Sequence, residues 1–515
     1  MAARYDAIVV GGGHNGLVAA GYLARAGNRV CLLERLEQVG GAAVSAQIFD
    51  GVDARLSRYA YLVSLLPQLI LDELGARVRL ARRAYSSYTP DPATAGRTGL
   101  LIGAHSSAPQ AFTEFYRRCQ IVTKPLWPTL LEPLPTRSQA RRRIVTGGDP
   151  NAVAAWRAMV DEPIGQIIVD AVRSDLIRGV IATDALIGTF ASLDDPTLVQ
   201  NVCFLYHLLG GGTGQWHVPV GGMGSVTAAL TTAAAAHGVE IVTGADVHAI
   251  SADGEVAYRH RGAERALRGR LVLAGVTPAV LAGLLGEPAP PAAPGAQVKV
   301  NMLVRRLPRL RDDSVTPAQA FSGTVHVNET CTQLEAAYSA AAGGRLPDPL
   351  PCEIYCHTLT DPSILSAGLR DSGAHTLTLF GLHTPHALSA DTEPDDLRTQ
   401  LTDSALRSLN CVLAEPIADL LLSDGSGGRC IETKTTLDLE HTLMMTGGNI
   451  FHGGLSWPFA EDDEDLTTPA QRWGVATAHD RILLCGSGAR RGGAVSGIGG
   501  HNAAMAAIAM LESVS

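Results

Sequence analysis

The N-terminal part of the chain contains three glycines and a carboxylate whose spacing suits the binding of a phosphate-bearing ligand. Gly11, Gly13 and Gly16 directly follow a short apolar run. Glycines at these positions permit a tight turn and let the backbone approach phosphate oxygens closely. Glu34 ends the next apolar run, near the offset of roughly 20 residues at which a carboxylate accepts hydrogen bonds from ribose hydroxyls. These residues predict a dinucleotide site.

The elements that must position these groups are a strand, a helix and a second strand. Residues 6–10 and 29–33 have the apolar character of buried parallel strands, and residues 17–26 suit a helix packed on a sheet. The helix start presents free backbone N–H groups to phosphates. An acid at position 34 disfavours the 2′-phosphate of NADP and leaves FAD and NAD open. The predicted contacts are Gly11, Gly13, His14, Asn15, Gly16 and Glu34.

A second glycine pair follows the second predicted strand. The stretch ERLEQVGGAAVS runs from Glu34 through Gly40 and Gly41 to Ser45. An NAD dehydrogenase does not need these glycines, whereas an extended FAD can use them for close backbone approach. The stretch resembles the second motif of the flavin-containing amine oxidase and phytoene-desaturase superfamily, whose members bind extended FAD. The resemblance implies FAD as cofactor, with Arg35, Gly40, Gly41 and Ala42 beside it.

Two distant segments resemble further FAD motifs of the same superfamily. The stretch PVGGMGS precedes an Ala-rich run and then residues 239–247, where the family reads the adenine with a valine backbone, here Val247. The segment RILLCGSG followed by GGAVSG is similar to the last FAD motif. Its implied cofactor contacts are Gly486, Ser487, Gly493, Ala494 and Val495.

The last motif also has a physical reading that is independent of the family. A glycine-rich turn at the start of a helix directs N–H groups and the positive end of the helix dipole at its neighbour. This arrangement would favour a reduced flavin, which carries more negative charge. The alternative is that the glycines only allow the helix to pack closely on a sheet.

The nearest resemblance is to the phytoene-dehydrogenase-related proteins, including the pyridine nucleotide-disulfide oxidoreductase domain-containing protein 2 group. Disulfide chemistry is not expected, because Cys31 has no second cysteine near it in the first unit. Cys352, Cys356 and His357 have no standard zinc spacing, so no metal site is predicted there. The pair Arg490-Arg491 departs from the superfamily pattern; it either binds an acidic substrate group or faces solvent.

The composition limits the class of protein. The 515 residues are 46% hydrophobic and carry a net charge of −9, which argues against nucleic-acid binding. Nine scattered cysteines fit a reducing compartment better than a disulfide framework. There is no apolar run long enough to span a membrane, and the N-terminus has the wrong order for a signal peptide. We therefore expect a cytoplasmic protein; oligomeric state is left open.

The positions of the FAD-like segments predict an α/β fold with a discontinuous Rossmann-like FAD-binding domain. This domain would comprise residues 1–80, 215–290 and 470–515, and an inserted α+β substrate or cap domain would comprise residues 81–214 and 291–469. Strands are expected at 298–304, 353–358 and 376–382, with a helix at 396–410.

Few side chains outside the cofactor motifs are candidates for catalysis. Lys299 could approach flavin N5 through a water, as a lysine does in related amine oxidases, or be a strand lysine whose stem packs on apolar surface. His452 could titrate near neutral pH beside a substrate, or cap loop backbone. Tyr59 and Tyr61 could form the pocket wall, or be core aromatics.

The resemblance implies an FAD-dependent oxidoreductase that desaturates, saturates or isomerises a hydrophobic small molecule, such as an isoprenoid, a polyene or a lipid. Such a substrate is compatible with peripheral membrane contact. One alternative is a flavin amine oxidase with an aromatic cage, although Trp457 and Phe459 are the only evident aromatic pair late in the chain. The other is a non-catalytic binding protein, because GDP-dissociation inhibitors share this fold.

Overall fold

The N-terminal strand lies in the middle of a mostly parallel sheet. The computed structural model describes residues 4–103, 108–291, 293–390 and 392–513. The sheet has seven strands in the order β10-β11-β12-β1-β2-β9, with β18 also paired to β12. Its strands are β1 (Arg4–Val10), β2 (Val30–Leu33), β9 (Glu240–Val242), β10 (Ala245–Ile250), β11 (Glu255–His260), β12 (Ala263–Ala274) and β18 (Ile482–Leu484).

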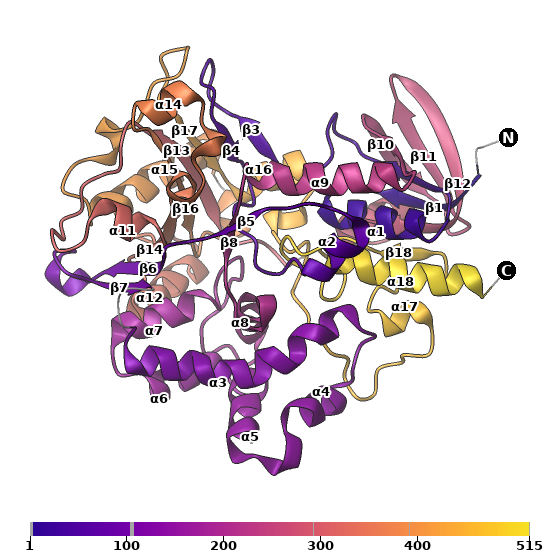
Figure 1. Cartoon of the computed structure of the whole chain (residues 1–515), viewed down its shortest axis with the longest axis horizontal. Helices are drawn as coiled ribbons and strands as arrows, with labels where there is room; N and C mark the ends of the chain where they lie inside the picture. Colours follow the sequence, from indigo (N-terminus) through magenta and orange to yellow (C-terminus); the bar gives the residue numbers. More distant parts are fainter. Residues whose placement is uncertain (1–3, 104–107, 292, 391, 514–515) are drawn as a thin grey trace.

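The predicted strand–helix–strand unit is confirmed. β1 pairs in parallel with β2, and α1 (His14–Arg25) connects them. The helix begins within the glycine motif, three residues earlier than its apolar run suggests. Helices α1, α2 (Gln68–Leu74), α9 (Met223–Ala236) and α18 (Ile498–Glu512) cover one face of this sheet (Figure 1). Together with β18, α18 brings the C-terminal segment against the N-terminal one.

A second, mixed sheet lies at the opposite end of the molecule, on the left in Figure 1. It also has seven strands, in the order β17-β13-β16-β15-β14-β6-β7. These are β6 (Tyr85–Pro90), β7 (Gly99–Gly103), β13 (Val298–Val304), β14 (Thr324–Val327), β15 (Cys352–Tyr355), β16 (His375–Gly381) and β17 (Ile431–Lys434). Around it lie α11 (Pro317–Phe321), α12 (Cys331–Ala342), α13 (His357–Thr360), α14 (Ala367–Asp371), α15 (Pro394–Asn410) and α16 (Thr436–Leu443).

Most of the expected elements of this region are confirmed. The predicted strands at 298–304 and 376–382 correspond to β13 and β16, and the helix at 396–410 corresponds to α15. The prediction of a strand at 353–358 is wrong in its second half, because β15 ends at Tyr355 and the helix α13 begins at His357. A change from strand to helix within a short apolar stretch leaves little trace in hydrophobic periodicity.

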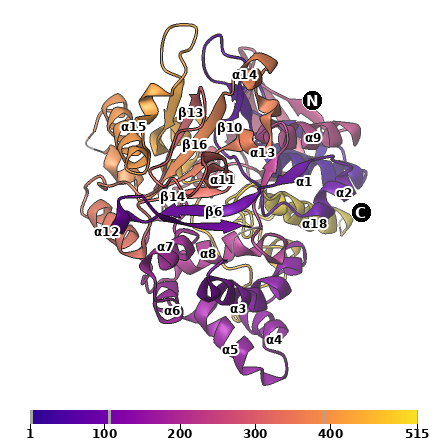
Figure 2. The same ribbon diagram turned by 60° about the vertical axis from the view of Figure 1, so that its left-hand side comes forward.

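A helical layer joins the two sheets along one side and extends below them (Figure 2). It consists of α3 (Gln110–Leu126), α4 (Arg137–Ile144), α5 (Pro150–Trp156), α6 (Ile164–Ala171), α7 (Asp175–Thr183) and α8 (Val199–Leu209), which share one apolar core. Shorter elements are β3 (Ser45–Gln47), β4 (Arg55–Ser57), β5 (Leu80–Arg82), β8 (His217–Pro219), α10 (Pro278–Leu285) and α17 (Pro469–Arg472).

The first sheet takes its strands from residues 4–33, 240–274 and 482–484. The second sheet takes β6 and β7 from the first long excursion of the chain and the other five strands from the second. The division into a discontinuous FAD-binding domain and an inserted domain stays a prediction. Among the described residues, no helix combines the length and apolar character required to cross a membrane.

Candidate functional site

A cavity of about 920 Å³ extends from the glycine turn after β1 to the second sheet and the helical layer. Nearly all residues singled out from the sequence line it: Gly11, Gly13, His14, Asn15, Gly16, Glu34, Arg35, Gly41, Ala42, Val247, Lys299, His452, Gly486, Ser487, Gly493, Ala494 and Val495. Gly40 is the exception. Its N–H donates to the Gly12 carbonyl, and a Cβ there would meet Val44, so it shapes the turn from behind the lining.

The glycines of the first turn have different roles. A Cβ added to Gly16 would collide with the Gly11 carbonyl oxygen, so Gly16 permits helix and strand to pack. A Cβ added to Gly13 would meet no atom within 4 Å, because it would enter the cavity. No side chain caps the N-terminus of α1. Free N–H groups beside an open space fit a phosphate group.

Glu34 is held with its carboxylate at the cavity wall. Its two oxygens accept hydrogen bonds from the N–H groups of Gly12 at 2.7 Å and Leu36 at 2.8 Å. Each carboxylate oxygen keeps a lone pair for a further donor. The neighbouring Arg35 already has a protein partner, because its guanidinium donates a hydrogen bond to the Thr442 carbonyl oxygen at 2.7 Å. Glu34 can therefore accept from ribose without rearranging.

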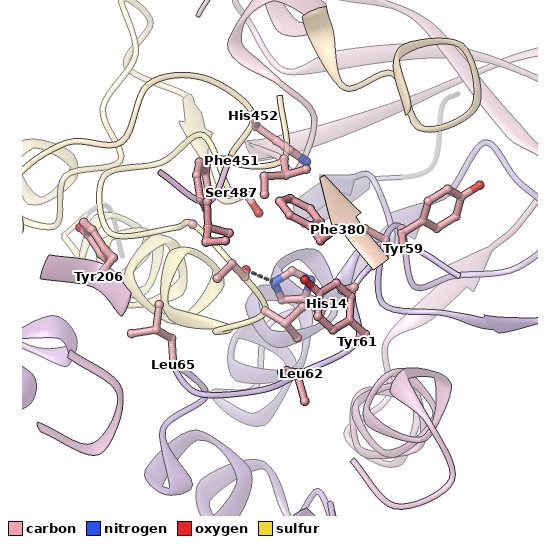
Figure 3. A pocket seen from close by; sticks show the side chains of 18 of the residues that line it. His14, Tyr59, Tyr61, Leu62, Leu65, Tyr206, Phe380, Phe451, His452 and Ser487 are labelled. Atoms are coloured by element: carbon pink, nitrogen blue, oxygen red, sulfur yellow. Dashed lines mark hydrogen bonds between the residues drawn. The ribbon is translucent and has the colours of Figure 1, made fainter. Parts of the chain in front are cut away.

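Two side chains of α1 join the N-terminal turn to the C-terminal motif. His14 Nε2 donates to the Ala494 carbonyl oxygen at 3.1 Å (Figure 3). Asn15 Nδ2 donates to the Gly492 carbonyl oxygen at 3.2 Å and to Ser487 Oγ at 3.4 Å. The two motifs are thus parts of one site although they lie at opposite ends of the sequence.

The C-terminal glycines serve packing as well as the cavity. A Cβ on Gly500 would collide with the Asn15 backbone, and a Cβ on Gly499 would lie 2.7 Å from the Gly486 carbonyl oxygen. Gly493, Ala494 and Val495 instead line the cavity. Packing therefore accounts for Gly499 and Gly500, whereas the role of the turn toward a reduced flavin stays a prediction.

His452 lies in the cavity wall but does not titrate near neutral pH as expected. Burial, with a smaller contribution from the nearby His14, lowers its pKa to about 4. Burial likewise lowers the pKa of His14 to about 4. His452 Nδ1 is buried and has no hydrogen-bond partner among the described residues. At neutral pH both imidazoles are uncharged hydrogen-bonding groups.

These pKa shifts predict a stability that falls with acid. A histidine whose folded pKa lies near 4 opposes folding as the pH drops from its unfolded value of about 6.5, because the unfolded chain binds more protons. The full effect is about 3 kcal/mol per histidine. In urea unfolding at pH 7 and pH 5, His452→Gln should lose less stability than the wild type. Equal losses in the two proteins would show that His452 is not buried as neutral imidazole.

Lys299 lies on β13 and is buried against the end of β4. Its Nζ donates to the carbonyl oxygens of Ser57 and Tyr59, each at 2.7 Å, and lies 4.8 Å from the centre of the Tyr61 ring. Burial lowers its pKa well below the ordinary value. These contacts make Lys299 a tie between β13 and residues 57–59, at the end of β4 and in the loop after it. Its catalytic role stays a prediction.

Aromatic side chains from the second sheet and from the loop after β4 form the cavity wall beyond the glycine turns. Tyr61 lies 4.8 Å from Tyr355 and 6.3 Å from Phe380, measured between ring centroids. Figure 3 shows Tyr61 and Phe380 near each other in the pocket. Tyr59 also lines the cavity. Trp457 and Phe459, the pair evident from the sequence, instead stack at 5.5 Å within the helical core. The cavity aromatics thus come from segments that are far apart along the chain.

The far end of the cavity contains a polar group of side chains that sequence reasoning missed. Arg83, Asp184, His326, Glu353 and Tyr355 all line it. One signal could have revealed part of this group. A prediction of β14 and β15 as an antiparallel pair in the correct register would have placed His326 opposite Glu353.

The Arg490-Arg491 pair was expected either to bind an acidic substrate group or to face solvent, and Arg491 does neither. Its side chain is 2% exposed and donates to the carbonyl oxygens of Thr129, Glu132 and Trp473. Arg490 forms a partly exposed ion pair with Glu464 at 3.0 Å. Arg491 therefore ties the C-terminal motif to the helical layer, and only Arg490 reaches the surface.

Known proteins with similar sequences cover the whole chain. A family model for an NAD(P)-binding Rossmann-like domain matches residues 9–69. An uncharacterized protein of Mycobacterium tuberculosis is 70% identical over 99% of this chain and 98% of its own length. Pyridine nucleotide-disulfide oxidoreductase domain-containing protein 2 of Rattus norvegicus is 30% identical over 97% of this chain and 93% of its own.

Solved structures with low sequence identity share the fold. A redesigned putrescine oxidase is 16% identical, with a TM-score of 0.58 and complete coverage of both chains. Cyclohexylamine oxidase from Brevibacterium oxydans is 15% identical, with a TM-score of 0.58 and 99% coverage of both chains. These similarities bear out the α/β fold with a Rossmann-like nucleotide-binding domain.

Proposed function

Because the chain belongs to the family of pyridine nucleotide-disulfide oxidoreductase domain-containing protein 2, we propose that it is an FAD-dependent oxidoreductase acting on a largely apolar substrate in the cavity. The residues present fit FAD. An open space above Gly13, the uncapped start of α1 and the exposed lone pairs of Glu34 suit the ADP portion. The turn at Gly493 to Val495 suits the flavin end.

Bound FAD would supply hydride or electron-pair exchange at its N5 atom. The chain supplies binding and orientation. His14 and Asn15 hold the C-terminal turn against the N-terminal one. Lys299 fixes the loop that bears Tyr59 and Tyr61, and this aromatic wall keeps water from the reacting region.

The observation that supports an apolar substrate is the extension of the cavity into the helical layer. There it is lined by Leu65, Phe112, Val180, Ile187 and Leu208. Such a wall fits the hydrocarbon part of an isoprenoid, polyene or lipid. The reaction would be desaturation, saturation or isomerisation.

Amine oxidation is a second candidate, favoured by the Tyr61, Tyr355 and Phe380 cluster. Anaerobic mixing of the flavin-loaded protein with long-chain unsaturated lipids or with amines compares the two. We expect lipids to bleach the flavin absorbance, or a chemically reduced protein to be reoxidised by them. Bleaching by amines alone would replace the proposed substrate class.

The C-terminal turn provides a prediction about redox chemistry. A Cβ on Gly493 would lie 2.7 Å from Leu455 Cδ2 and 3.4 Å from Phe451 Cδ1, so the larger side chain of Gly493→Leu crowds these two residues and pushes either them or the turn out of place. Loss of its N–H donors should weaken FAD binding or lower the reduction potential, on the order of 10–40 mV. A reductive titration against a dye of known potential measures this. Unchanged occupancy with unchanged potential would separate this turn from the flavin.

A further inference from the structure

Three side chains with metal-binding atoms meet at the far end of the cavity. His326 on β14 and Glu353 on β15 are directly paired across the two strands. After β14, Asn328 adopts a φ of 57°, and the resulting turn brings Glu329 back toward His326. The three residues are therefore assembled by strand register and one turn.

The distances between these groups suit a single ion. His326 Nδ1 lies 2.6 Å from Glu329 Oε2 and 3.6 Å from Glu353 Oε1. One ligand atom from each residue lies within 4.8 Å of the others. An ion bonded at about 2.0–2.2 Å to nitrogen and oxygen ligands can span such separations.

The carboxylates of the cluster have no direct lysine or arginine partner among the described residues; Arg83 acts on Glu353 without forming an ion pair with it. His326, Glu329 and Glu353 are 6%, 1% and 4% exposed. Glu329 Oε1 is buried without any hydrogen-bond partner in the same part of the chain. Such an oxygen is costly unless a ligand or proton satisfies it.

Burial raises the pKa of Glu329 well above its ordinary value and that of Glu353 to about 8. The nearest other charged side chains have partners: Arg83 donates to Thr324 Oγ1, and Asp184 accepts from Tyr116.

Neighbouring hydroxyl groups orient the carboxylates. Tyr355 donates to the second oxygen of Glu353, and Thr183 donates to Glu329 Oε2 at 3.3 Å. Hydrogen bonds of this kind commonly hold metal ligands in place. His326, Glu353 and Tyr355 also line the cavity, which leaves one side of the cluster accessible.

We propose that His326, Glu329 and Glu353 bind one divalent cation of the zinc and manganese class, whose open coordination positions face the cavity. A hydroxyl, carbonyl or carboxylate oxygen at the polar end of a substrate would bind there. The site goes beyond the proposed redox function and does not depend on it.

Metal content and binding of the flavin-loaded protein test the proposal. After dialysis against a chelator, the protein should take up one equivalent of Zn²⁺ or Mn²⁺, measured by elemental analysis and calorimetry. Glu329→Gln and His326→Gln should each weaken the affinity at least tenfold. Glu264→Gln is a matched control, because Glu264 accepts from His248 at 2.8 Å on the surface, and it should bind like the wild type.

Two outcomes would overturn the site. One is a wild-type protein that contains no ion and takes up neither Zn²⁺ nor Mn²⁺. The other is uptake that is equal in the wild type and in folded Glu329→Gln and His326→Gln proteins, with folding checked by thermal unfolding. Should either variant fail to fold, Glu353→Gln provides the same comparison with the wild type.

Discussion

Gly13→Val should yield a folded protein that does not retain FAD. Gly13 has φ −65° and ψ 168°, a conformation that valine adopts readily, and an added Cβ meets no protein atom within 4 Å. The new side chain instead occupies the space where the backbone must approach the pyrophosphate. Flavin absorbance should therefore be lost from the purified variant, with the far-ultraviolet circular dichroism unchanged.

Gly283→Val is the matched control. Gly283 lies in α10, and a Cβ there also meets no atom within 4 Å, but Gly283 does not line the cavity. This variant should retain wild-type flavin content. Recovery of flavin-loaded Gly13→Val would mean that the glycine turn does not hold the pyrophosphate.

Glu34→Ala should weaken FAD binding by one to two orders of magnitude. The change would remove the charge-assisted hydrogen bonding of the carboxylate to ribose, for which one bond of roughly 1.5–3 kcal/mol gives this loss. It also leaves the N–H groups of Gly12 and Leu36 without their acceptor, which lowers the stability of the turn itself. Titration of flavin-depleted protein with FAD, followed by fluorescence quenching, gives the dissociation constant.

Glu34→Gln separates the two effects. Its amide oxygen can still accept one backbone N–H, whereas the negative charge is lost. We expect an intermediate affinity and a thermal unfolding temperature close to that of the wild type. Equal FAD affinity in wild type, Glu34→Gln and Glu34→Ala would exclude Glu34 from the cofactor site.

The nucleotide-binding part of the fold was predictable because its determinants are local. The glycine turn, the helix after it and Glu34 lie within one short stretch, and each has a steric or hydrogen-bonding reason for its residue type. The C-terminal turn is assigned to the flavin mainly through resemblance, because a glycine-rich turn before a helix can also serve packing alone. Its physical link to the first turn, through His14 and Asn15, depends on contacts between the ends of the chain.

The substrate part of the cavity could not be derived in the same way. Whether His452 titrates depends on its burial, and burial follows from the packing of segments far from it in sequence. From the sequence alone, Arg491 is expected at the surface. Its burial depends on three backbone carbonyl groups from distant segments that accept its hydrogen bonds. The His326 and Glu353 pair requires the register of two strands, which side-chain patterns alone do not specify.

The flavin content of the purified protein tests the central claim most directly. The cavity joins the glycine turn, Glu34 and the C-terminal motif into one site that fits FAD. We predict visible flavin absorbance with one FAD per chain, released on denaturation, or full reconstitution by added FAD. A colourless protein that cannot be reconstituted with FAD would contradict the account and favour a non-catalytic binding protein with this fold.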